Sequence, residues 1–340
     1  MKKTIKFTSL IAVIVLVLTV CVFFAACNEQ GGNGGNPDTA ESLTFSAPEG
    51  TPALAMLRLV TDNAKIGDYS MTYKVVKPAN IASEMASGSS DLVIMPVNAG
   101  ANLIRQGANY KLVSVAVDGS LYMVGKTGKG SALTIDDVKG KKIACIGQTG
   151  VPGLVFRYVM KANNVQIVDE NTAPDENQVS VRYVADGPAA RVLLANGNVD
   201  FAVVGEPAAT AFKGALKLDS EIDMQAEYAK ASGATTYAQA GLFVKSDLAG
   251  NQSFVDSLFD ALAANKNWIN ANPSEVDAFA KEHLYESATF PAASIARCKV
   301  NATRLDDTQK SEIVTFLASV MPKDSKGDAI DWQAAKDLLF

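Results

Sequence analysis

Short apolar runs alternate with amphipathic stretches along most of the chain after residue 43. The runs have the length of buried strands, and the stretches between them have the 3.6-residue period of helices. One such run, FAVV at 201–204, is followed by Gly205, Glu206, Pro207 and a helical pattern of small residues. This alternation predicts an α/β fold in which helices flank mostly parallel sheets.

The order of predicted strands and helices occurs twice. The letters GTPAL at 50–54 correspond to GVPGL at 150–154, and ASGSSD at 86–91 corresponds to ANGNVD at 195–200. In each copy of the second motif, the glycine suits the left-handed residue that follows a helix, and the aspartate precedes an apolar run. We interpret these aspartates as turn residues without a role in ligand binding. The repeat predicts two similar lobes.

Two strand-like segments connect the predicted lobes. The chain is expected to leave lobe 1 near residues 116–122 and to return near 237–242, which gives a two-segment hinge. Lobe 1 then comprises 43–120 and 238–340, and lobe 2 comprises 121–237. Helices are predicted in the C-terminal region at 253–271, 274–284, 291–298, 306–320 and 331–339, and we expect them to pack on lobe 1.

The first 42 residues have the pattern of an export signal and a tether. A basic start, MKKTIK, precedes an apolar run that ends in small residues before Cys27. This pattern predicts a signal peptide at 1–26, and its end resembles a bacterial lipobox, which implies a lipid on Cys27. Residues 27–42 are rich in glycine and asparagine and predict a flexible tether. The alternative is an uncleaved anchor, because about 20 apolar residues can span a bilayer.

Charge and composition narrow the function classes. The 340 residues carry a formal net charge of −5 and contain a single histidine, His283. No basic block with interleaved aromatic residues indicates nucleic-acid binding. The isolated histidine and the absence of CxxC or HxxxH spacing predict no metal site, and no cofactor is expected. Cys145 and Cys298 lie in different predicted lobes and are expected to be buried free thiols.

Five predicted strands end in a short polar loop that opens a helix, and four of these loops carry a proline in the first turn. The carboxyl ends of parallel strands form the ligand crevice of α/β sheets, and helix N-termini leave backbone N–H groups unpaired. We therefore predict a cleft between the lobes for a polar or anionic small molecule. The predicted ligand-binding residues are Thr51, Pro52, Asn98, Ala99, Gln148, Thr149, Gly150, Asp186, Glu206 and Tyr237.

Several of these residues have a structural alternative. Thr51 and Asn98 could cap helices, and Asp186 could hold its own turn. Glu206 is harder to explain in this way, because glutamate is not a favoured N-cap residue. We expect its carboxylate to accept hydrogen bonds from an amine or a hydroxyl group of the ligand.

Several segments together resemble a known family. They are the lipobox, the tether, the GTPAL start, DLVIMPVNAGANLI, LTIDDVKGKKIACIGQTGVPGLVFRYVMK and GNVDFAVVGEPAATAF. They look like substrate-binding lipoproteins of ABC importers, in the branch that includes proteins for aliphatic sulfonates, nitrate and thiamine pyrimidine precursors. The resemblance implies a type II periplasmic-binding-protein fold, lobe closure on a ligand and docking on a membrane permease. The Glu206 carboxylate fits a sulfonate-only site poorly and favours a ligand with hydrogen-bond donors.

The resemblance implies a solute receptor without enzymatic activity, monomeric and lipid-anchored at the outer face of the cell membrane or in the periplasm. One alternative is an enzyme on the same fold, with thiamine-pyrimidine-type or related lyase chemistry. The predicted cleft offers no histidine, and Glu206 with Asp186 is its only acid–base pair. Another alternative is an accessory lipoprotein that senses a ligand and signals to a membrane receptor. The sequence does not separate this alternative from transport.

Overall fold

The computed structural model describes residues 41–130 and 133–340. The predicted signal peptide, Cys27 and nearly all of the tether lie outside these residues. Within the described part, no helix combines the length and apolar character needed to cross a membrane.

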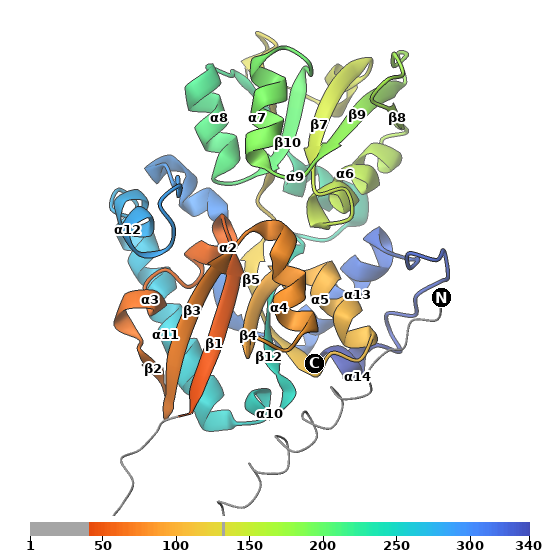
Figure 1. Cartoon of the computed structure of the whole chain (residues 1–340). Helices are drawn as coiled ribbons and strands as arrows, with labels where there is room; N and C mark the ends of the chain where they lie inside the picture. Colours follow the sequence, from red (N-terminus) through yellow and green to blue (C-terminus); the bar gives the residue numbers. More distant parts are fainter. Residues whose placement is uncertain (1–40, 131–132) are drawn as a thin grey trace, which may run out of the picture. The chain divides into compact units, whose positions relative to one another are not determined.

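The described chain forms two β-sheets (Figure 1). The first sheet has the strand order β13 (Val300–Arg304), β5 (Tyr110–Asp118), β12 (Ala238–Lys245), β4 (Leu92–Pro96), β1 (Ser42–Pro48), β3 (Tyr69–Val76) and β2 (Lys65–Ile66). The second has the order β11 (Ser220–Asp223), β6 (Leu121–Gly125), β10 (Phe201–Gly205), β7 (Lys141–Ile146), β9 (Gln178–Val184) and β8 (Gln166–Asp169). We call the first sheet and its helices lobe 1, and the second lobe 2.

The two sheets share one topology. The series β3-β1-β4-β12-β5 in lobe 1 corresponds to β9-β7-β10-β6-β11 in lobe 2. In each series the first three strands are parallel, and the fourth is antiparallel to both neighbours. The antiparallel strand is the one that the chain forms just after crossing from the other lobe. The repeat in the sequence therefore corresponds to a repeat in the fold.

The repeated aspartates make the same contact in both lobes. Asp91 Oδ2 accepts a hydrogen bond from Thr44 N at 2.7 Å, and Asp200 Oδ2 accepts one from Lys142 N at 2.8 Å. Each carboxylate joins a turn to the start of the neighbouring parallel strand. These contacts give both aspartates a structural role that requires no ligand, as the sequence predicted.

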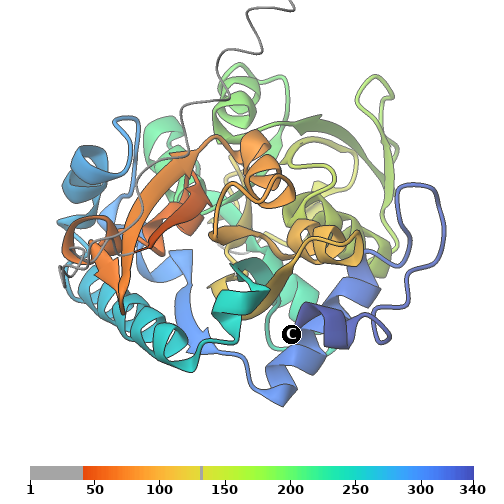
Figure 2. The same cartoon turned by 60° about the horizontal axis from the view of Figure 1, so that its bottom comes forward.

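Helices cover both faces of each sheet. The helices of lobe 1 are α2 (Thr51–Leu54), α3 (Leu59–Asp62), α4 (Ile81–Ala86), α5 (Val97–Arg105), α10 (Ser246–Ala249), α11 (Gln252–Ala271), α12 (Val276–His283) and α14 (Lys336–Leu339). Those of lobe 2 are α6 (Val151–Ala162), α7 (Gly187–Ala195), α8 (Ala208–Leu216) and α9 (Met224–Ser232). Figure 2 shows α11 running along the side of lobe 1.

The strand β10 shows why these sheets are buried on both sides. Successive side chains of a strand point to opposite faces. Phe201 and Val203 belong to one buried apolar cluster, whereas Ala202 and Val204 belong to another that includes Phe212 of α8. A continuous apolar run is the pattern expected for such a strand.

Two short crossovers join the lobes. The chain passes from β5 to β6 through Gly119 and Ser120, and it returns between α9 and β12. Gly119 N donates to Tyr237 O at 2.9 Å, so the two crossovers lie side by side. A Cβ atom on Gly119 would meet the Tyr237 ring at 2.9 Å, which explains the glycine at this position.

The C-terminal region differs from the prediction in three ways. Of the helix predicted at 331–339, only α14 (Lys336–Leu339) forms. Residues 291–298 form two 3-10 turns, η4 (Ala292–Ser294) and η5 (Ala296–Cys298), and the unpredicted strand β13 follows them. The helix α13 (Asp307–Val320) does not pack on lobe 1 alone, because it also contacts α6 of lobe 2. The described C-terminal region therefore reaches both lobes.

Candidate functional site

The loops at the carboxyl ends of the strands in the two lobes contact each other directly. Thr51 Oγ1, at the start of α2, donates to the backbone oxygen of Glu206 at 2.7 Å. Asn98 Nδ2, in the first turn of α5, donates to Thr149 O at 2.9 Å. The predicted residues of the two lobes therefore meet at one interface.

Asn98 leaves a buried acceptor unsatisfied at this interface. The residue is 3% exposed, and its bond to a backbone carbonyl identifies the atom that points there as the amide nitrogen. Its Oδ1 atom has no hydrogen-bond partner. A buried polar atom without a partner is rare, and at an interface between lobes it is a natural contact for a ligand donor.

A second unpartnered polar atom lies on the first crossover. The hydroxyl of Ser120 is buried and makes no hydrogen bond. Ser120 N donates to Gln239 Oε1 at 3.0 Å, and Gln239 precedes Ala240, which pairs with Pro96 two residues before Asn98. The first crossover is therefore tied to β12, the strand next to β4, whose end precedes Asn98.

Glu206 is buried, and protein groups contact both of its carboxylate oxygens. Its side chain has an exposed fraction of 0%. Oε2 accepts from Thr210 N at 3.1 Å, and Oε1 accepts from Thr210 Oγ1 at 2.9 Å and from Arg297 Nε at 2.5 Å. The carboxylate thus caps the start of α8 and pairs with a cation from the C-terminal region. Direct contact with a ligand stays a prediction.

Arg297, which was not predicted from the sequence, binds carboxylates of lobe 2. Beyond Glu206, its two terminal nitrogens bond both oxygens of Glu221 on β11, each at 3.0 Å. Its guanidinium carbon lies 3.9 Å from the centre of the Tyr122 ring, within cation–π range. We call Arg297, Glu206 and Glu221 the ion tie. Glu221 also pairs with Lys213 of lobe 2 at 3.0 Å, whereas Glu206 has Arg297 as its cation.

Within the ion tie, Glu221 and Arg297 hold each other in the charged state. Burial disfavours charge on Glu221, but hydrogen bonds from Arg297 and then Lys213 lower its pKa below the usual value. Burial likewise opposes charge on Arg297, but its bonds to Glu221 and Glu206 raise its pKa above the usual value. The bidentate arrangement is the strong geometry for an arginine–carboxylate pair.

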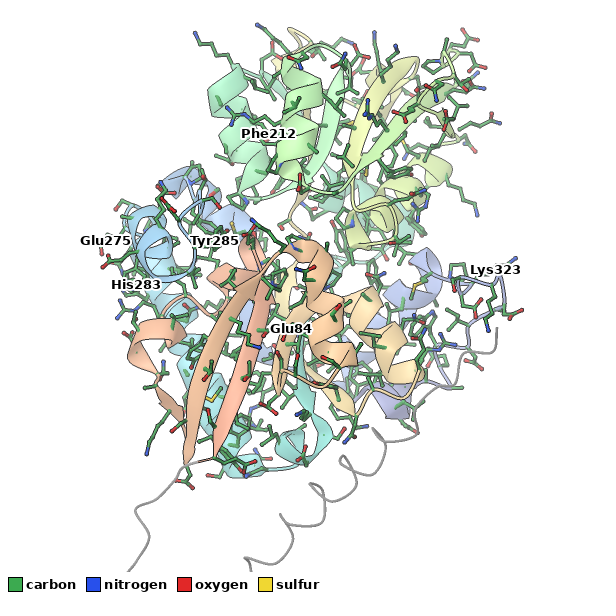
Figure 3. All side chains as sticks on the ribbon, in the orientation of Figure 1. Glu84, Phe212, Glu275, His283, Tyr285 and Lys323 are labelled. Atoms are coloured by element: carbon green, nitrogen blue, oxygen red, sulfur yellow. The ribbon has the colours of Figure 1, made fainter. Side chains whose placement is uncertain are left out.

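Protein groups use several helix-start amides that were expected to be unpaired. Gly50 N donates to the hydroxyl of Tyr285 at 2.9 Å, and Figure 3 labels Tyr285 in the C-terminal region. Ala189 N donates to Asp186 at 3.0 Å, so Asp186 caps its own helix. Thr210 N donates to Glu206, as described above. Fewer backbone N–H groups are therefore free to bind an anion at this interface than the sequence predicted.

The remaining predicted residues occupy varied positions. Gln148 and Thr149 are exposed, whereas Pro52, Ala99 and Gly150 are half-buried. Thr51 is not the N-cap of α2, because Gly50 occupies that position with a φ of 94°. Asn98 is not a cap either, since α5 begins at Val97 after Pro96.

A buried aromatic cluster joins the lobes beside the second crossover. Tyr237 stacks on Phe316 of α13 with ring centres 5.4 Å apart, and Tyr228 of α9 meets both rings edge-on. Each of the three side chains is no more than 3% exposed. The hydroxyl of Tyr237 donates to Gln225 at 2.9 Å, so this predicted ligand residue already has a protein partner.

The reactivity of the Cys298 thiol, next to Arg297, tests whether this part of the interface is buried. Cys145 and Cys298 are unpaired and fully buried, on β7 and in η5. Burial raises the pKa of the Cys298 thiol from 9.0 to about 12 and raises that of Cys145 as well. At pH 8, the thiolate fraction of Cys298 is then roughly 1,000-fold below that of an unfolded cysteine.

We expect iodoacetamide at pH 8 to label Cys298 at least 1,000-fold more slowly in the native protein than in urea, by peptide mapping. The unfolded thiol ionises above pH 9 while the folded thiol keeps its proton. The thiol contribution to the free energy of unfolding is therefore complete below pH 9 and is lost as the pH rises towards 12. Rapid labelling of the folded protein would contradict this assignment.

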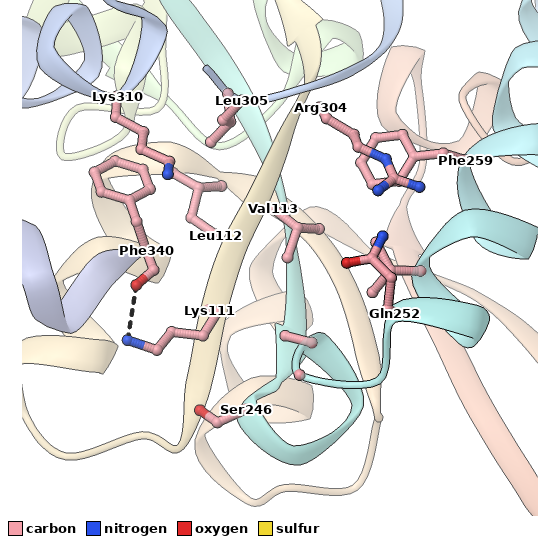
Figure 4. Close-up of a pocket in the computed structure, with 13 residues that line it drawn as sticks. Lys111, Leu112, Val113, Ser246, Gln252, Phe259, Arg304, Leu305, Lys310 and Phe340 are labelled. Carbon is pink, nitrogen blue, oxygen red and sulfur yellow. Dashed lines mark hydrogen bonds between the residues drawn. The ribbon is translucent and has the colours of Figure 1, made fainter. Parts of the chain in front are cut away.

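A cavity in the described structure lies away from this interface. It measures about 470 Å³, and Figure 4 shows residues that line it. They include Lys111, which pairs with Val244 near the end of β12 opposite Ala240, the residue beside Pro96. Its cations already have partners: Lys111 Nζ bonds Phe340 O at 2.9 Å, Arg304 pairs with Asp256, and Lys310 pairs with Asp307. None of the predicted ligand residues lines it, so we place the candidate site at the interface between the lobes on chemical grounds.

Among the described residues, no group of three or more histidine, cysteine, aspartate or glutamate side chains is arranged to hold a metal ion. No protein-family model matches the chain, and a search of curated proteins finds no match.

Solved structures match the fold over most of its length. An ABC transporter protein from Parabacteroides distasonis superposes with a TM-score of 0.68 at 20% identity, covering 85% of this chain and 96% of that one. The ligand-binding component of an ABC-type import system from Staphylococcus aureus, with zinc bound, gives 0.59 at 11% identity, covering 82% and 91%. The periplasmic aliphatic sulphonate binding protein SsuA from Escherichia coli gives 0.58 at 14% identity, covering 88% and 87%. These similarities confirm the predicted fold, with two α/β lobes.

Proposed function

We propose that this protein is an extracytoplasmic solute-binding lipoprotein that captures a small polar molecule between its lobes and delivers it to an ABC importer. The observation that carries the proposal is the interface at Asn98, where the strand ends of both lobes meet around an unpartnered acceptor. The crossovers would act as the hinge, and binding across the gap would favour the closed state by its differential affinity.

The similar structures support the class of ligand and of partner. Two of them are described as a binding component of an importer and as a periplasmic binding protein. A permease partner, a monomeric state and a lipid on Cys27 are part of the same proposal. Anchoring would keep the binding domain at the outer face of the cell membrane, where it meets solute before the permease does.

Asn98 and Ser120 favour a ligand that carries a hydrogen-bond donor, rather than an anion with acceptors alone. The unpartnered oxygen of Asn98 accepts hydrogen bonds and repels negative charge, so the ligand needs an N–H or O–H group there. The Ser120 hydroxyl can donate to a second atom of the same molecule.

Native mass spectrometry of gently purified protein tests for a molecule that stays bound through purification. A thermal-shift panel then compares donor-bearing pyrimidines and amino acids with nitrate and methanesulfonate, which lack N–H and O–H donors at neutral pH. We expect a donor-bearing compound at 100 times its Kd to stabilise the protein by about 2.7 kcal/mol, which raises the melting midpoint. A panel of diverse solutes that leaves the midpoint unchanged, together with no co-purified molecule, would contradict a solute-binding role.

A further inference from the structure

The ion tie connects lobe 1 to lobe 2. The two crossovers alone would let the lobes rotate relative to each other. Arg297 belongs to η5. Cys298 of the same turn and the preceding Ile295 share one buried apolar cluster with Leu54 of α2. Lys299 O also accepts a hydrogen bond from Asp118 N at 3.1 Å. The backbone that carries Arg297 is therefore fixed to lobe 1.

The carboxylates that Arg297 holds belong to lobe 2. Glu206 follows β10, and Glu221 lies on β11 at the edge of the second sheet. Three hydrogen bonds and a cation–π contact with Tyr122 of β6 thus run from one lobe to the other. If the lobes turn apart at these carboxylates, Glu206 leaves its cation.

We propose that Arg297 stabilises the closed arrangement of the lobes and thereby sets the affinity for a molecule bound between them. The effect on affinity rests on the proposed function, because a tie between the lobes affects binding only if the lobes open and close. Arg297 is then a positioning residue, which acts on the ligand through closure rather than by contact.

Charge distinguishes the ion tie from the aromatic cluster that also connects the lobes. The cluster of Tyr228, Tyr237 and Phe316 is buried and carries no charge, so salt does not weaken it by screening. The side chain of Arg297 is 30% exposed and that of Glu221 is 22% exposed, so salt ions can reach the tie. Screening is strong at 1 M salt, where the Debye length is about 3 Å.

The test measures the distance between the lobes with no small molecule added. Spin labels are introduced through p-acetylphenylalanine at Val192 of α7 and Leu338 of α14, which are 59% and 55% exposed, and the native cysteines stay untouched. Pulsed dipolar spectroscopy then compares wild type with the double variant Glu206→Gln, Arg297→Met, which leaves no unpaired charge at Glu206. Glu221→Gln is a milder variant, because it removes only one of the two carboxylates of the ion tie. Arg182→Met is the matched control, because Arg182 and its partner Glu170 both lie in lobe 2.

We expect the ratio of closed to open molecules to fall about tenfold in the double variant and less in Glu221→Gln. In wild type, 1 M NaCl should lengthen the distance, whereas the double variant should not respond further to salt. Arg182→Met should match wild type. Distance distributions that coincide in wild type and in both tie variants, at low and high salt, would overturn the proposal. Because no solute is present, that outcome would leave the solute panel as a separate test of the proposed function.

Discussion

Arg297→Met alone is expected to lower the free energy of unfolding by about 3–5 kcal/mol. Glu206 is the reason, because its side chain is fully buried and Arg297 is its cation. Removing the arginine leaves a buried carboxylate that keeps its two bonds from Thr210 but loses its counter-charge. Glu221 suffers less, because it is partly exposed and retains Lys213.

Urea denaturation of single and double variants separates the charge effect from lost packing. Glu206→Gln retains an oxygen to accept from Thr210, so the double variant Glu206→Gln, Arg297→Met should recover most of the loss. A buried ion pair replaced by neutral groups is often nearly neutral in stability. The expected coupling between the two positions is several kcal/mol, at the upper end for residues in direct contact. Additive effects would mean that Glu206 is not held as a buried ion.

The repeat and the crossovers could be predicted because their signals are local. Each buried strand is a continuous apolar run, each helix is amphipathic, and Gly88 and Gly197 have φ values of 69° and 67° as helix ends require. The order of these elements then limits the topology, since parallel strands need crossover connections. Strand β13 was missed because VNATR, at the edge of the sheet, mixes polar and apolar residues.

The chemistry of the interface was harder to predict, because it depends on contacts far apart in sequence. Glu206 was singled out because capping was not expected to explain it, yet its carboxylate bonds Thr210, four residues away, at the start of α8. Its other partner, Arg297, lies 91 positions away in a short turn with no periodic pattern. No local signal pairs these two residues. The same holds for Thr51, whose hydroxyl reaches a backbone oxygen 155 positions away instead of capping its own helix.

Asn98→Ala is expected to weaken binding of a donor-bearing solute by about 10- to 100-fold. The substitution removes the unpartnered oxygen that we assign to the ligand, and it also removes the bond to Thr149 O across the interface. Isothermal titration calorimetry with the solute that gives the largest thermal shift measures the change. Asn109→Ala, at an exposed asparagine in lobe 1, is the matched control and should bind as wild type does.

A chemical double-mutant cycle distinguishes a ligand contact from a purely structural role of Asn98. An analogue of the same solute with its donor methylated should bind wild type more weakly by a similar factor, because the buried Oδ1 again lacks a partner. In Asn98→Ala the methylated and unmethylated solutes should bind almost equally. If methylation costs the variant as much as it costs wild type, the donor meets some other atom, and Asn98 contributes through its bond between the lobes alone.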